Sequence, residues 1–136
     1  MQLNPYLLFN GNCAEAFKFY EKCLGGKIEA MLTHAETPMA DQVSPEWRGK
    51  IVHARLTLGN QALMGSDAPP EQYEPMKGFS VLLLDKDPTE IERIFNALAA
   101  KGTVRMPLQK TFWSEKFGML IDQFGTPWTI NCEPAA

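Results

Sequence analysis

Residues 6–26, YLLFNGNCAEAFKFYEKCLGG, place a short apolar strand before a helical pattern that two glycines close. The same order returns later, where the apolar run from Phe79 to Leu84 precedes a second helical pattern that ends near Gly102. Strand-like runs follow both helices. Repeated units of this kind bury a continuous core by packing on one another. We therefore expect two small modules that share a sheet and enclose one cavity, with the function located where they meet.

The first helix is predicted from Cys13 to Leu24. Asn12 precedes it and Glu15 occupies its third position, which is the spacing of a side-chain cap at a helix start. Gly25 supplies the left-handed residue that ends many helices. The apolar positions recur at helical spacing, so one face should pack on a sheet. These positions are Cys13, Phe17, Tyr20 and Leu24.

The second helix carries clearer terminal signals. Asp87 is the expected cap, Pro88 suits the first helical position, and Glu90 stands three residues after the cap. Gly102 is the expected stop. The predicted buried stripe consists of Ile91, Ile94, Phe95 and Leu98.

Period-two alternation predicts the strands. Residues 51–58 place His53 and Arg55 on the polar face, and the return strand at residues 62–64 closes a hairpin. In the second module, Pro107 limits a weaker strand at residues 104–108 to an edge or a bulge. The remaining strands are predicted at residues 118–122 and 127–133.

Two stretches lack periodicity and are predicted as loops. They are residues 37–49 and 66–78, which contain several prolines and aromatic side chains and are typical of lids. We expect a single domain of two modules, residues 1–67 and 78–133, joined by a loop at residues 68–77. The fold class is α+β, with two βαβββ modules that form a curved, cup-shaped mixed sheet and helices on its outer face.

Composition narrows the class of protein. At 136 residues and 45% hydrophobic content, the chain has the size and apolar content of one ordinary domain. A net charge of −3 without any run of Lys or Arg argues against nucleic acid as a partner. Apolar runs are too short for a membrane span. Cys13, Cys23 and Cys132 follow no zinc-binding or CxxC spacing, so we expect reduced thiols and a cytoplasmic location.

The order of elements resembles the vicinal oxygen chelate superfamily, which includes glyoxalases, bleomycin-resistance proteins and extradiol dioxygenases, and most of all its PhnB-like group. That group is sometimes labelled after demethylubiquinone methyltransferases. A methyltransferase cofactor such as S-adenosylmethionine would need a glycine-rich run like G-x-G-x-x-G, and the sequence has none. The resemblance implies a homodimer. It rests on residues 5–7, 11–17, 19–20, 51–54, 63–67, 117–122, 124–125, 127–128 and 131–133.

The resemblance also bears on metal binding. It places one ligand on the first and the fourth strand of each module, so that four side chains converge on one divalent ion, and the matching positions are Pro5, Met64, Phe79 and Asn131. Proline and phenylalanine offer no ligand atom, and a thioether suits only soft metals. We therefore expect neither a metal ion nor another cofactor.

Several polar residues are candidates for the site. His53 could act as a hydrogen-bonding group or a base near neutral pH, or it could be a half-exposed strand histidine. Arg55 could anchor an anionic substrate or form a cross-strand ion pair. On the last strand, Asn131 is favoured as a cavity residue. Glu133 could serve as an acid or base, although a solvated strand end is the simpler interpretation.

Apolar candidates complete the predicted site. Phe9, Met64, Phe79 and Trp113 would line an apolar pocket. Ordinary core packing is the alternative, and it suits Trp113 least because that residue lies in a predicted loop. The function predicted first is metal-independent binding of a small molecule. The alternative is an enzyme, namely a metal-dependent or acid–base lyase, isomerase or dioxygenase, in which His53 and Glu133 are the leading candidates for catalysis.

Overall fold

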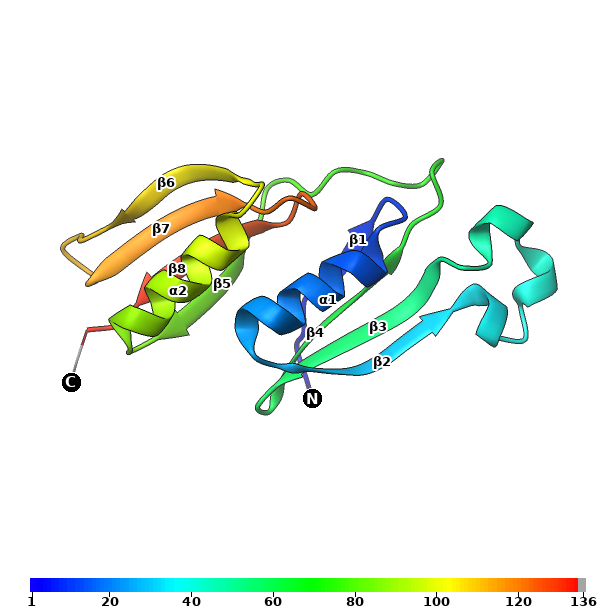
Figure 1. The fold of residues 1–136 in the computed structure, drawn as a ribbon, viewed down its shortest axis with the longest axis horizontal. Coiled ribbons are helices and arrows are strands. Elements are labelled where there is room, and N and C mark those ends of the chain that lie inside the picture. Colours follow the sequence, from blue (N-terminus) through cyan, green and yellow to red (C-terminus); the bar gives the residue numbers. More distant parts are fainter. Residues whose placement is uncertain (135–136) are drawn as a thin grey trace. The chain divides into compact units, whose positions relative to one another are not determined.

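The computed structural model describes residues 1–134 and divides the chain into two compact units, Met1–Glu74 and a second that begins at Pro75. Each unit contains one four-stranded sheet and one long helix (Figure 1). We describe each unit by itself.

The first unit runs β1 (Tyr6–Phe9), α1 (Cys13–Leu24), β2 (Lys27–Thr33), β3 (Ile51–Leu58) and β4 (Gln61–Asp67). Its sheet has the strand order β1-β4-β3-β2, in which β1 is parallel to β4 and the other neighbours are antiparallel. Between β2 and β3 the predicted loop forms three short 3-10 turns, at His34–Glu36, Ala40–Gln42 and Pro45–Trp47.

The second unit repeats this plan with β5 (Val81–Asp85), α2 (Pro88–Ala99), β6 (Thr103–Gln109), β7 (Lys116–Ile121) and β8 (Pro127–Cys132). Its strand order, β5-β8-β7-β6, has the same single parallel pair. Register shifts interrupt the β2–β3 and β6–β7 pairs, and such irregularities bend a sheet. The α+β class and the two βαβββ modules are therefore confirmed.

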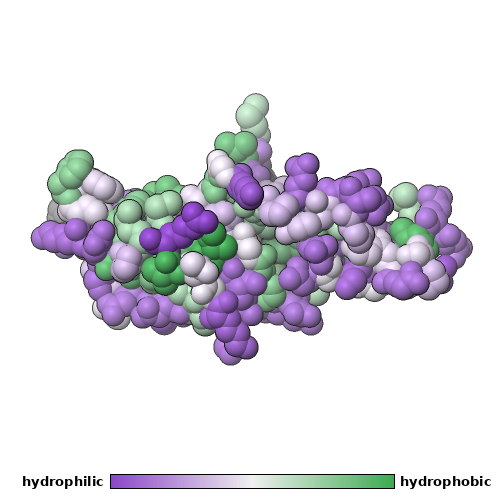
Figure 2. Space-filling view, turned by 90° about the horizontal axis from the view of Figure 1, so that it is seen from above, coloured by the Kyte–Doolittle hydropathy of each residue, from purple (hydrophilic) through white to green (hydrophobic). Residues whose placement is uncertain are grey.

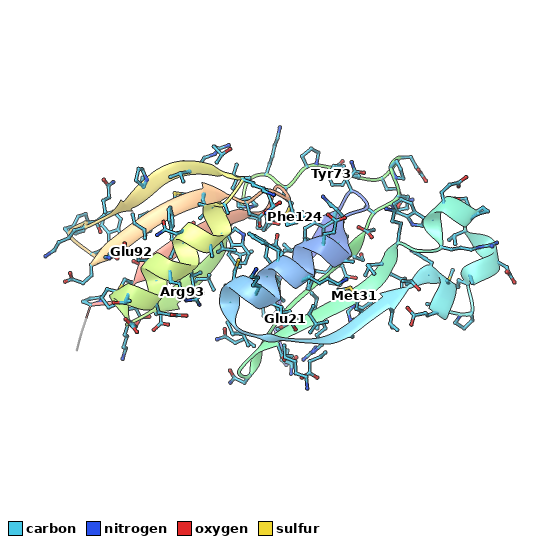
Figure 3. The ribbon with its side chains drawn as sticks, in the orientation of Figure 1. Glu21, Met31, Tyr73, Glu92, Arg93 and Phe124 are labelled. Atoms are coloured by element: carbon cyan, nitrogen blue, oxygen red, sulfur yellow. The ribbon has the colours of Figure 1, made fainter. Side chains whose placement is uncertain are left out.

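Helix α1 packs on its sheet through an aromatic cluster. Phe17 and Tyr20 contact Phe9, with ring centroids 6.1 and 6.4 Å away. Gly65 permits this packing, because a Cβ atom there would lie 2.6 Å from the Leu7 carbonyl oxygen and 3.0 Å from the Phe17 ring. Glu21 then fastens the helix to the adjacent strand, since its carboxylate accepts a 2.7 Å hydrogen bond from the Ile28 N–H (Figure 3).

The predicted cap of α1 is wrong. Asn12 makes no side-chain hydrogen bond to the first turn. Instead, the buried carboxylate of Asp67 accepts from the Cys13 N–H at 2.9 Å, because the parallel pairing of Phe9 with Asp67 brings the end of β4 to the helix start. A carboxylate is the stronger acceptor, so the distant residue replaces the local one. The left-handed end at Gly25 is confirmed.

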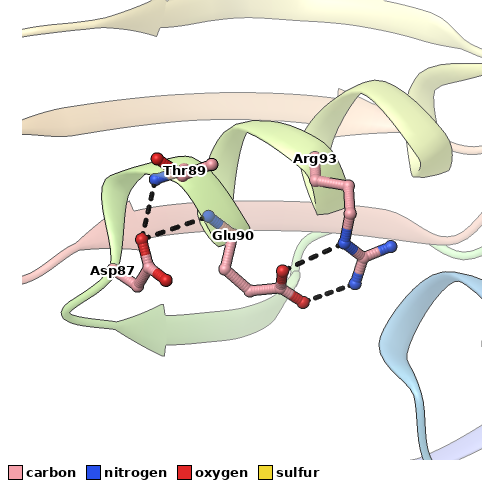
Figure 4. Close-up of polar contacts among 4 residues, drawn as sticks. All are labelled: Asp87, Thr89, Glu90 and Arg93. Carbon is pink, nitrogen blue, oxygen red and sulfur yellow. Dashed lines mark hydrogen bonds and ion pairs between the residues drawn. The ribbon is translucent and has the colours of Figure 1, made fainter.

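Helix α2 begins as predicted. Asp87 accepts from the N–H groups of Thr89 and Glu90, at 3.0 and 3.4 Å (Figure 4). One turn on, Arg93 donates to Glu90, and this hydrogen bond lowers the pKa of the Glu90 carboxyl. Lys116 on β7 pairs with Glu92, which projects from the same helix (Figure 3).

The predicted end of α2 needs correction. Ala100 closes the helix, and Lys101 rather than Gly102 adopts a positive φ, of 60°. Gly102 is instead required for close approach, because a Cβ atom there would lie 2.4 Å from the Ile121 carbonyl oxygen. Within the described residues, no helix is both long and apolar enough to cross a membrane.

Candidate functional site

Each sheet has one face under its helix and one face that its own unit leaves open. On the open face of the first unit, Tyr6 and Leu8 of β1 are 48% and 45% exposed. Tyr6 pairs with Met64, and Met64 pairs with Arg55, so three neighbouring strands contribute to one row. Large apolar side chains exposed in a group are typical of binding surfaces.

His53 and Arg55 add polar groups to this open face. The His53 imidazole stacks on the Tyr6 ring, with centroids 6.2 Å apart and planes 24° apart. Arg55 is half-buried, and its guanidinium has no ion-pair or hydrogen-bond partner among residues 1–134. The cross-strand ion pair considered for Arg55 is therefore not formed there. Three of the predicted site residues, His53, Arg55 and Met64, share one surface.

Phe9 does not belong to that surface. It is 1% exposed and lies under α1, where it pairs with Asp67 rather than with a residue of the open face. Side chains alternate along a strand, so Phe9 and Tyr6, three residues apart, point to opposite faces. The prediction that placed Phe9 with Met64 in one pocket is wrong, and the alternative of ordinary core packing holds.

The open face of the second unit is also apolar, with Leu82 and Leu84 of β5 52% and 51% exposed. Asn131 lies beside Leu84 on one side and Phe117 on the other. Its side-chain oxygen is buried and accepts no hydrogen bond within the described residues. A buried acceptor without a donor is costly, and a ligand or water commonly satisfies such an atom.

A pocket of about 540 Å³ opens at one end of this unit. Its apolar lining includes Phe79, a predicted site residue, together with Met119 and Ile121 of β7. Two cations, Lys77 and Arg105, also line it. Figure 2 shows, for the face it presents, hydrophobic (green) residues that reach the surface between hydrophilic (purple) ones. The remaining lining residues are Met76, Gly78, Ser80, Leu120, Pro127 and Trp128.

Sequence reasoning missed Lys77 and Arg105. Lys77 lies in a predicted loop. Arg105 lies in the strand at residues 104–108, which was predicted only weakly because it contains Pro107. The signal was the isolated cation at residue 105 within an otherwise apolar strand, but only the fold brings the loop and this strand to one pocket.

The other predicted candidates lie apart from this pocket. Trp113 lies in the loop between β6 and β7 and is half exposed. Its ring contacts the Phe117 ring edge-on, with centroids 5.4 Å apart. Glu133 follows the end of β8, where its backbone N–H donates to the Asp85 carbonyl oxygen at 2.8 Å. Glu133 as a residue is half-buried, and the acid–base role considered for it stays a prediction.

The positions matched to a metal site do not all meet. Pro5 and Met64 are neighbours, since the Met64 N–H donates to the Pro5 carbonyl oxygen at 3.1 Å. Asn131, however, pairs with Leu84, and Phe79 precedes Leu84 by five residues, or about 16 Å of strand. The expectation that Phe79 and Asn131 face one point is therefore wrong. Among the residues described, no three His, Cys, Asp or Glu side chains gather in a group suited to a metal ion.

The three cysteines are free thiols, and all are buried. Burial, with a smaller contribution from the nearby Asp67 carboxylate, raises the pKa of the Cys13 thiol. Burial likewise raises the pKa of Cys132. A nucleophilic cysteine needs a stabilised thiolate, so these thiols are packing residues.

Comparison with known proteins supports this picture of the fold. A family model described as 3-demethylubiquinone-9 3-methyltransferase matches residues 1–131. Protein YjdN of Escherichia coli is 36% identical over 139 residues, which cover 96% of this chain and 95% of that protein.

Two solved structures are also similar along the whole chain. Protein PA1353 of Pseudomonas aeruginosa is 49% identical, with a TM-score of 0.91 and coverage of 99% of both chains. A putative 3-demethylubiquinone-9 3-methyltransferase, PhnB protein, of Bacillus cereus is 27% identical, with a TM-score of 0.81 and coverage of 97% of this chain and 99% of that one.

Proposed function

This chain belongs to the PhnB-like family of the glyoxalase/bleomycin-resistance superfamily, the family whose model is described as 3-demethylubiquinone-9 3-methyltransferase, and we propose that it binds a small organic molecule. We further propose that this binding needs no metal ion. The observation that carries the proposal is the pocket of about 540 Å³ in the second unit, whose volume is in the range of small-molecule sites.

Metal independence is supported by the chemistry of the residues that the family resemblance matches to metal ligands. In the first unit, where the two matched positions are neighbours, they hold a proline and a thioether, and neither suits a hard divalent ion. Methyl transfer is not part of the proposal, since the sequence lacks a glycine-rich run for the cofactor. A homodimer in the cytoplasm completes the proposal, and its support is the family resemblance together with three unpaired cysteines.

A thermal-shift screen of small molecules tests the binding. At 100 times its Kd, a ligand of the native protein should raise Tm by roughly 8 °C, and EDTA should not change this rise. Met119→Trp, which fills the pocket, should abolish the shift. Leu32→Trp, which makes the same kind of change on the open face of the first unit, should preserve it.

Two results would contradict the proposal. If EDTA removes the shift, or elemental analysis finds one equivalent of a divalent metal, the binding is not metal-independent. If Leu32→Trp rather than Met119→Trp abolishes the shift, the ligand binds to the first unit and the pocket has been misassigned.

A second candidate function is acid–base catalysis by a lyase or isomerase. The observation that favours it is the His53 ring stacked on Tyr6 beside Arg55, whose guanidinium has no partner among residues 1–134. In that case His53→Ala should lower turnover of a substrate about 100-fold or more, since general acid–base groups contribute at least that factor. Glu133→Gln tests the other candidate. Unchanged turnover in both variants would exclude this function, and loss of turnover on chelation would indicate a metal-dependent dioxygenase or lyase instead.

A further inference from the structure

We propose that the ligand of the second unit's pocket is an organic anion, with a carboxylate, sulfonate or phosphonate group on an apolar body. Lys77 and Arg105 bind the anionic group. This inference rests on the proposed function, because it specifies the chemical class of the molecule that the same pocket holds.

The charges in the pocket are of one sign. Lys77 and Arg105 both line it, whereas no Asp or Glu is among the lining residues in the described part of the chain. Neither cation forms an ion pair or a side-chain hydrogen bond within residues 1–134. Elsewhere in the same unit, Arg93 and Lys116 are paired with Glu90 and Glu92. The pocket thus keeps two cations available for an incoming anion.

The local charge is opposite to that of the whole chain. The chain carries a net charge of −3, so its overall charge does not favour anions. Attraction must come from the two cations at short range. A guanidinium also offers several N–H donors in a planar fork, which matches the oxygens of a carboxylate, sulfonate or phosphonate.

The rest of the pocket favours an apolar body on the same molecule. Seven of its eleven lining residues have apolar side chains, namely Met76, Phe79, Met119, Leu120, Ile121, Pro127 and Trp128. Ser80 is the one hydroxyl residue of the lining, and it is already hydrogen-bonded to Thr129 at 2.7 Å. A small inorganic anion would leave this apolar surface in water, so an organic anion fits the lining better.

Two fluorescent probes separate charge from apolar contact. 8-Anilinonaphthalene-1-sulfonate carries a sulfonate, and N-phenyl-1-naphthylamine has the same aromatic body without it. The wild-type protein should bind the sulfonate at least tenfold more tightly. Arg105→Gln and Lys77→Gln should each weaken sulfonate binding about fivefold, the upper range for a pair open to solvent, and leave the neutral probe unaffected. Lys86→Gln removes a cation outside the pocket and should change neither affinity.

The outcomes distinguish this inference from the proposed function. If both probes bind equally and Arg105→Gln changes neither, the anion inference is overturned, while a loss of both probes in Met119→Trp still supports the pocket as a binding site. If Met119→Trp leaves both probes bound, the pocket itself is misassigned and the proposed function fails there. If Lys86→Gln weakens sulfonate binding as much as Arg105→Gln does, the attraction is general and the specific site is excluded.

Discussion

Replacement of Asp67 by alanine should lower the free energy of unfolding by about 4 kcal/mol, since two buried backbone N–H groups would each lose a charged acceptor worth about 2 kcal/mol. These groups belong to Cys13 and Ile51, and they lie 2.9 and 2.8 Å from the two carboxylate oxygens. Asp67 is 5% exposed, so water does not readily replace the carboxylate.

The size of this effect follows from what Asp67 joins. One oxygen caps α1, the other binds the first residue of β3, and the residue itself ends β4. Its loss therefore weakens three segments of the first unit at once. Denaturant unfolding monitored by circular dichroism measures the change.

Two variants make the measurement specific. Asp67→Asn keeps one carbonyl oxygen as an acceptor and should fall between wild type and Asp67→Ala. Asp87→Ala removes the exposed cap of α2 and should cost only about 1 kcal/mol. A loss in Asp67→Ala no larger than in Asp87→Ala would show that the buried carboxylate does not hold the unit together.

Most elements of the fold were predictable because their signals are local, but no strand was predicted at residues 27–33, where the structure has β2. β1 and β3 were predicted with the boundaries that the structure has, and the Asp87 cap of α2 lies next to the residues it caps. β4 is longer than predicted, because its last residues, Ser66 and Asp67, lie beside β1 and continue its pairing. A small polar pair of this kind resembles a loop when its neighbour in space is unknown.

The cap of α1 was not predictable in the same way. Asn12 has the local pattern, yet Asp67, far along the chain, satisfies the helix start. Here parallel pairing delivers a distant carboxylate to the start of the helix, where the local side chain makes no hydrogen bond. Local sequence spacing therefore does not predict that Asp67 binds the start of this helix.

The candidate site was only partly predictable, for the same reason. Alternation correctly placed His53 and Arg55 on one face of β3, because that pattern lies within one strand. Phe9 was assigned to the wrong face, and Phe79 and Asn131 were expected to meet, because both inferences needed the register between strands. Lys77 and Arg105 line the same pocket only because the tertiary structure brings the loop and the strand together.

In the second unit, Asp122→Ala should cost about 5 kcal/mol, because three donors would lose a buried carboxylate at about 1.5–2 kcal/mol each. One oxygen accepts from the N–H groups of Phe124 and Thr126, at 2.8 and 3.1 Å. The other accepts from the indole N–H of Trp128 at 2.8 Å. The carboxylate thereby fixes both the turn before β8 and the largest buried side chain of the protein.

A double-mutant cycle isolates the bond to the indole. Asp122→Asn keeps an acceptor for the turn but places an amide N–H₂ against the Trp128 N–H, and two donors that face each other cannot bond. Trp128→Phe removes the indole N–H and relieves this conflict. The double variant should therefore be more stable than the sum of the single losses predicts, by about 1–2 kcal/mol. Additive losses would mean that the Asp122 carboxylate acts on the turn alone and that the indole of Trp128 is held by packing.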